Sequence, residues 1–159
     1  MKYLVLLGLM ASFAPGAPAF AAEPAAPLLG TWTLDLEHSQ IPPDQRPKSV
    51  NITYSDVGGG KWNSKVDVIG RGGGEIHATG TYPLDGSPAP STGYNNVDTV
   101  AAKVTAPNVL VMAFYKEGMP RTTRIYTVSG DGKTMSETIV WLNINGKPEI
   151  TTNQFNRVP

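Results

Sequence analysis

Arg124 and Tyr126 are the residues in this sequence whose types and spacing best suit ligand chemistry. They lie two positions apart in a β-rich run, so both side chains point to the same face of a strand. A guanidinium beside a phenol could hold a carboxylate, because arginine offers two parallel N–H donors. The alternative is a surface arginine whose aliphatic stem covers a neighbour. If Arg124 is buried, either a ligand or an acid such as Glu137 must pair with it.

The two histidines, His38 and His77, give weaker signals, because neither lies in an H-x-H or H-x-x-x-H pattern typical of metal sites. We interpret both as solvated or hydrogen-bonded side chains and predict no metal and no cofactor. His77 shares a strand face with Glu75. That face is either the wet outer wall of a barrel or a polar lumen, and in the second case His77 would join the ligand site.

No sequence motif predicts catalysis. Gly58-Gly59-Gly60-Lys61 and the glycines of residues 70–74 lack the spacing and the following helix of phosphate- or dinucleotide-binding loops, so they indicate hairpin turns. No strand-turn-helix elbow surrounds a serine. A Ser-His-Asp triad can still assemble from distant positions, but nothing in the chain points to one. We therefore predict no catalytic residue and expect a protein that is not an enzyme.

The start of the chain has the layout of a secretory signal peptide. Lys2 precedes an apolar run to about Phe13, and Ala19-Phe20-Ala21 follows as a small-residue cleavage site. We expect removal of residues 1–21, with cleavage after Ala21 or, failing that, after Ala22. The alternatives are a membrane anchor or an N-terminal helix, but the apolar run is too short to span a bilayer. This predicts a periplasmic or secreted protein with no integral membrane segment after cleavage.

Charge and cysteine content narrow the possible partners. The chain carries 13 basic and 13 acidic residues, so it has no electrostatic attraction to nucleic acid or to an anionic membrane. It has no cysteine, which excludes disulfides and lipid attachment at a cysteine. Residues 22–27 are a Pro/Ala linker by composition, and residues 28–159 have the length of a single domain.

The sequence of this domain predicts an all-β fold in which short strands are joined by tight turns. Asp131-Gly132 and Asn145-Gly146 are strong hairpin signals, because a two-residue type I′ turn needs φ > 0 at both central positions. We expect an antiparallel up-and-down meander that closes into a barrel of about 8–10 strands, since closure removes exposed strand edges. The predicted strands are Gly30–Leu36, Lys48–Ser55, Lys61–Ile69, Glu75–Tyr82, Val97–Thr105, Val109–Lys116, Arg121–Val128, Met135–Ile144 and Glu149–Arg157.

Two connections, Glu37–Lys48 and Pro83–Asn96, are long enough to cover an opening of the barrel. Long loops in compact domains are often functional. If a ligand pocket exists, we expect its mouth to be bordered by Pro83–Asn96, with Tyr94 at the rim. Arg124 would then be the polar anchor, assisted by Tyr126.

The first and last strands must be neighbours if the barrel closes, and Arg157 could then stack on Trp32. Gly30-Thr31-Trp32 resembles the G-x-W signature that opens lipocalins and related calycin barrels, and Arg157 matches the late arginine that packs across that tryptophan. The opening Gly30–Asp35 and the turn Val128–Thr134 are also similar to those of small bacterial secreted proteins with no established ligand. These resemblances imply a lipocalin-like barrel in the periplasm and transfer no catalytic residue.

Two functions remain open at this point. The first is non-catalytic binding of a small apolar or amphipathic ligand, favoured by strands such as Val109–Lys116 that are apolar on both faces. The second is a module that binds a protein or an envelope polymer and has a packed lumen. The direction of the aromatic side chains separates them, because a barrel is filled if most of these point inward: Trp32, Tyr54, Trp62, Tyr82, Phe114, Tyr126 and Trp141.

Overall fold

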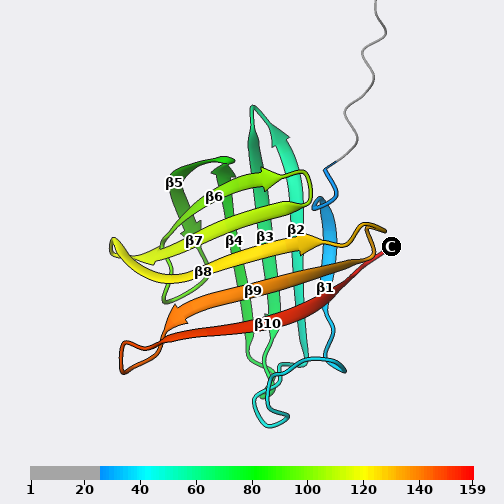
Figure 1. The fold of residues 1–159 in the computed structure, drawn as a ribbon. Coiled ribbons are helices and arrows are strands. Elements are labelled where there is room, and N and C mark those ends of the chain that lie inside the picture. Colours follow the sequence, from blue (N-terminus) through cyan, green and yellow to red (C-terminus); the bar gives the residue numbers. More distant parts are fainter. Residues whose placement is uncertain (1–25) are drawn as a thin grey trace, which may run out of the picture.

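Ten antiparallel strands form a closed barrel in residues 26–159, the part of the chain that the computed structural model describes (Figure 1). The strands follow one another around the barrel in chain order, and β10 closes it against β1. The predicted signal peptide, and the predicted linker up to residue 25, lie outside the described residues. The strands are β1 Gly30–Leu34, β2 Ser49–Gly58, β3 Lys61–Ile69, β4 Glu75–Pro83, β5 Asp85–Thr92, β6 Thr99–Ala106, β7 Val109–Lys116, β8 Met119–Val128, β9 Thr134–Leu142 and β10 Pro148–Arg157.

The all-β meander is as predicted, but the prediction of a loop over Pro83–Asn96 is wrong, because strand β5 lies within it. This strand contains Pro88 and Pro90, which argue against a strand in sequence. Both prolines nevertheless pair with β6, opposite Ala101 and Thr99. The proline content of this segment suggested a loop. Proline can nevertheless lie in a strand wherever its nitrogen does not have to donate a hydrogen bond.

The prolines of β5 face strand β4, and these two neighbouring strands pair at few positions. The N–H of Ser91 donates to the Asp98 carbonyl on the β6 side, so the nitrogens of the alternate residues Pro88 and Pro90 face β4. They have no hydrogen to donate. Strands β4 and β5 accordingly pair at two positions, Thr79 with Thr92 and Gly80 with Ser91.

Two strands end earlier than predicted, in each case because a side chain captures the next backbone amides. After β1, Asp35 Oδ1 accepts the N–H groups of Glu37 and His38, both at 3.1 Å. After β9, Asn143 Oδ1 accepts those of Asn145 and Lys147 at 2.9 and 3.0 Å. Such Asx contacts turn the chain out of a sheet. The strands therefore end at Leu34 and Leu142 rather than at Leu36 and Ile144.

The added strand also decides which connections share an end of the barrel. Each hairpin reverses the chain, so the connections after odd-numbered strands all lie at one end. Residues 35–48 and residues 93–98 therefore share an end with the β7–β8 and β9–β10 turns. Residues 35–48 are a loop, as predicted. The loop is held by Arg46, whose Nε and Nη2 donate to the carbonyls of Ile41 and Ser39 at 2.7 and 3.0 Å.

The opposite end is closed by Trp32, which has no exposed surface. Its indole N–H donates to the Leu28 carbonyl at 2.9 Å, and the Arg157 guanidinium lies over its ring with the central carbon 4.1 Å from the centroid. The expected contact between these two residues is therefore present. Gly30 has φ +112°, and a Cβ there would lie 2.9 Å from Arg157 Nη1. Glycine at this position thus leaves room for the arginine.

The interior of the barrel contains both aromatic rings and aliphatic side chains. Trp141 is half-buried, whereas the other six aromatic residues singled out in the sequence are buried: Trp32, Tyr54, Trp62, Tyr82, Phe114 and Tyr126. Strand β7 is apolar on both faces in sequence, but only one face is fully buried, with Leu110, Met112 and Phe114, and the other face is half-buried. These side chains leave little free volume in the lumen, so a sizeable site inside the barrel must lie toward one of its ends.

Candidate functional site at the mouth of the barrel

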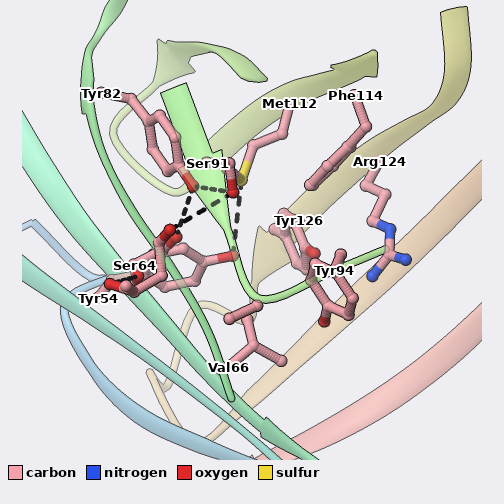
Figure 2. A pocket seen from close by; sticks show the side chains of 12 residues that line it. Tyr54, Ser64, Val66, Tyr82, Ser91, Tyr94, Met112, Phe114, Arg124 and Tyr126 are labelled. Carbon is pink, nitrogen blue, oxygen red and sulfur yellow. Dashed lines mark hydrogen bonds between the residues drawn. The ribbon is translucent and has the colours of Figure 1, made fainter. Parts of the chain in front are cut away.

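A small cavity of about 20 Å³ lies in the lumen among the aromatic rings. That volume is enough for a single water molecule. Figure 2 shows the phenols of Tyr54, Tyr82 and Tyr126 around it, with Arg124 at one side. Because the cavity is so small, a ligand larger than a few atoms cannot lie in the lumen without moving these rings.

A larger hollow of about 150 Å³ opens at the end of the barrel that carries residues 93–98. We call it the mouth hollow. It is lined by Tyr94, Asn96, Val97, Phe114, Arg121, Thr122 and Arg124. Three of these side chains, those of Tyr94, Phe114 and Arg124, also line the inner cavity. These three therefore form the partition between the mouth hollow and the lumen, and in Figure 2 they lie together on one side of the cavity.

Arg124 projects from β8 into this partition. Its guanidinium carbon lies 5.1 Å from the centroid of the Phe114 ring, and its Nη1 donates to Glu137 Oε1 at 3.0 Å. Its Nε is buried and has no hydrogen-bond partner among the described residues. A buried N–H without an acceptor is costly, so this atom marks the place where a water or a ligand atom would be held most favourably.

Glu137 neutralises Arg124 and is itself almost fully buried, with 2% of its surface exposed. It also accepts hydrogen bonds from the Tyr126 hydroxyl and from Asn153 Nδ2, each at 2.9 Å. The register explains this convergence, because Tyr126, Glu137 and Asn153 are direct partners on β8, β9 and β10. Burial, and then the neighbouring Glu137 charge, raise the pKa of Tyr126 well above its usual value. The phenol therefore stays protonated and donates.

A second polar group lines the other side of the cavity. The Tyr82 hydroxyl donates a hydrogen bond to Ser91 Oγ at 3.2 Å and accepts a hydrogen bond from Ser64 Oγ at 3.4 Å. Its ring lies across Gly80, where a Cβ would be 2.0 Å from the Tyr82 hydroxyl oxygen. These hydroxyls can each rotate to donate or accept, so the inner cavity can accommodate a polar atom of either kind.

The structure brings three of the four predicted ligand-binding residues together and separates the fourth. Arg124, Tyr126 and Tyr94 all line the inner cavity, and Tyr94 also borders the mouth hollow, as expected. His77 instead lies on the outer wall, and its side chain is 61% exposed. The prediction that His77 lines the lumen and joins the ligand site is therefore wrong. The residues of β4 that point inward are Ala78, Gly80 and Tyr82.

His77 has two acidic partners on the outer wall. Its Nδ1 lies 2.6 Å from Asp67 Oδ1, and its Nε2 lies 3.1 Å from Glu75 Oε2. The hydrogen bond with Asp67, followed by that with Glu75, raises the pKa of His77. Among residues 26–159, no group of three or more His, Asp or Glu side chains is placed to hold a metal ion.

Sequence reasoning missed Arg121 and Asn153. Arg121 is the extra residue of a β-bulge, because Phe114 pairs with Thr122 and Tyr115 pairs with Pro120. A bulge re-aims the side chain it inserts, and here Arg121 reaches the rim between the mouth hollow and the outer surface. Pro120 was the one hint, since proline in a sheet often accompanies a bulge.

No protein-family model matches the sequence, and no curated protein matches it. Solved structures with a similar fold do exist. The fluorescent protein UnaG superposes with a TM-score of 0.55 at 15% identity, over 82% of this chain and 96% of UnaG. An asparagine-to-alanine variant of UnaG gives 0.56 at 14% identity, over 84% and 97% of the two chains. At these identities the likeness concerns the fold alone.

No helix in residues 26–159 has the length and the apolar character needed to cross a membrane.

Proposed function

We propose that this barrel binds one small amphipathic molecule at its mouth and carries out no reaction on it. The observation that carries the proposal is the buried Nε of Arg124, which has no partner and lies in the partition between the mouth hollow and the inner cavity. A hydrogen-bond acceptor on a ligand in the hollow would satisfy it. Unsatisfied buried donors are rare in proteins, and each one calls for an explanation, such as a functional role or a bound water or ion.

The size and lining of the mouth hollow suit an aromatic ring or a short apolar chain. Tyr94, Val97 and Phe114 supply apolar surface, and the volume is about 150 Å³. A cavity of similar volume accepts a benzene ring in a protein core. Closed barrels of eight or more strands commonly hold one small ligand in this way.

The second candidate is a module that binds a protein or an envelope polymer. Six buried aromatic rings help to fill the lumen, as this candidate requires. Apolar side chains are also exposed around the β9–β10 turn: Leu142 at 66%, Ile144 at 100% and Ile150 at 70%. Exposed apolar patches often mark interaction surfaces. We rank it second because it leaves the unpaired Arg124 Nε unexplained.

Thr122 and Thr123 allow a matched test, because they are neighbours on β8 and only Thr122 lines the mouth hollow. The neutral probe N-phenyl-1-naphthylamine is titrated into wild type, Thr122→Phe and Thr123→Phe, and its fluorescence is followed. We expect filling the hollow in Thr122→Phe to weaken binding at least about tenfold, with less than about a twofold change in Thr123→Phe. Equal affinity in all three proteins would remove the hollow as the site.

Two further measurements bear on the ligand itself. A fluorescent fatty acid methyl ester, which carries a neutral carbonyl acceptor, should bind wild type more tightly than Arg124→Ala, and equal affinity would remove Arg124 from the site. Native mass spectrometry of protein purified from its own compartment should show a retained small molecule. If neither probe binds to wild type and no molecule is retained, the interaction module becomes the better proposal.

We also propose that the protein is exported and works in the periplasm or outside the cell. The support is the charged, apolar and small-residue order of residues 1–21. Intact-mass measurement of protein recovered outside the cytoplasm should give a chain beginning at Ala22. A mass that includes Met1 would contradict this.

A further inference from the structure

We propose that the ligand is an anion whose charged group lies at the rim beside Arg121, while a neutral acceptor on its body reaches the Nε of Arg124. This rests on the proposed function above and adds the ligand's chemical class and its orientation. The argument depends on how charge is distributed between the two arginines of the mouth hollow.

The charge of Arg124 is already balanced within the protein. Glu137 Oε1 accepts from its Nη1 at 3.0 Å, and Glu137 is almost fully buried. A ligand carboxylate bound at the free Nε would lie across the same guanidinium from the Glu137 carboxylate. Two carboxylates close together in a weakly solvated site repel strongly. A carbonyl, ether, hydroxyl or ring nitrogen can accept from Nε without that penalty.

The charge of Arg121 is not balanced. Among the described residues, no carboxylate lies within 4.0 Å of its guanidinium, whereas Asp98, which follows Val97 of the mouth hollow, is paired with Lys116 at 3.6 Å. The bulge places Arg121 on the rim, and it is exposed. An anionic group beside it keeps part of its hydration, so the site avoids the cost of burying a charge.

These two arginines together fix an orientation. The apolar body of the ligand occupies the hollow against Tyr94 and Phe114, and its anionic group faces solvent at Arg121. An exposed ion pair is worth a modest amount and is screened by salt. The dependence of affinity on Arg121 should therefore be small, about two- to fivefold, and it should decrease as the salt concentration rises.

Two probes with the same anilinonaphthalene body test this inference. One is 8-anilino-1-naphthalenesulfonate, which is an anion, and the other is the neutral N-phenyl-1-naphthylamine. Each is titrated at low and high salt into full-length wild type, Arg121→Gln, Arg121→Lys and the control Lys147→Gln. Lys147 is another exposed cation at the same end, but it does not line the mouth hollow. Thermal melts confirm that every variant is folded.

We expect Arg121→Gln to weaken binding of the sulfonate about two- to fivefold at low salt and to leave the neutral probe unchanged. Arg121→Lys should recover most of the loss, and Lys147→Gln should bind both probes like wild type. An unchanged sulfonate affinity in Arg121→Gln, or an equal loss for both probes, would overturn the inference and leave the proposed function standing. Failure of wild type to bind either probe would overturn both.

Discussion

The Arg157 guanidinium lies over the indole of Trp32, with its central carbon 4.1 Å from the ring centroid, and the two residues are also direct partners where the last strand meets the first. Trp32 is fully buried. We expect Trp32→Ala to lower the free energy of unfolding by about 3–5 kcal/mol, because it removes a large ring from a packed core. Urea denaturation measures this. A loss below about 1 kcal/mol would mean that this contact does not hold the barrel closed.

Arg157→Lys tests whether the geometry of the guanidinium matters as well as its charge. Arg157 donates to the carbonyls of Gly132 and Leu29 at 2.6 and 2.8 Å and also to that of Pro27. A lysine cannot make this set of bonds and also stack on the ring. We expect a loss of about 2 kcal/mol or more. Arg71→Lys is the control, since exposed Arg71 makes one such bond, to Asp44, and similar losses in both variants would contradict the prediction.

The buried pair of Arg124 and Glu137 should show strong coupling. Glu137→Gln leaves the Arg124 charge without a counter-charge, and we expect it to destabilise the fold by about 2–4 kcal/mol. Arg124→Met alone leaves the buried Glu137 carboxylate without a counter-charge in the same way. The double variant should be less destabilised than the sum of the two single variants, by about 1–3 kcal/mol in denaturant titrations. Additive effects would show that the pair is not energetically linked.

His77 should make the stability of the outer wall depend on pH. Its hydrogen bonds with Asp67 and Glu75 raise its pKa above the ordinary value of 6.5. A raised pKa in the folded state stabilises the fold fully below pH 6.5, and this contribution is lost as pH rises through the folded pKa. The difference in Tm between wild type and His77→Gln should therefore shrink as the pH rises through the pKa that His77 has in the folded state. A constant difference would show that the charge on His77 contributes nothing.

Local patterns were enough to predict most of the barrel. Strands β3 and β7 begin and end at the predicted residues. Gly132 and Gly146 have φ +70° and +73°, but Asp131 and Asn145 do not have positive φ, so the predicted two-residue type I′ turns are replaced by longer turns. Strand β5 was missed for a physical reason. Its two prolines are acceptable only because their nitrogens face a seam with few hydrogen bonds, and that seam is a property of the assembled sheet.

The candidate site was predictable only in part. Alternation along β8 put Arg124 and Tyr126 on one face, and the cost of burying a charge pointed to Glu137, which does pair with Arg124. The bulge at Arg121 depends on the register between β7 and β8, which no local pattern encodes. The free volume in the lumen depends on how six rings pack against one another, and that is decided by the whole barrel.

The position of Arg157 near the end of the sequence also affects how a new chain can fold. Its hydrogen bond to Leu29 joins residues 128 positions apart, and closing a loop of that length costs roughly 4 kcal/mol of chain entropy. When the chain folds from its N-terminal side, β1 pairs with β2 early but waits for β10, the last of the ten strands of the barrel. Its other edge stays open for that whole period. The partly folded chain should therefore be most prone to aggregate until β10 pairs with β1.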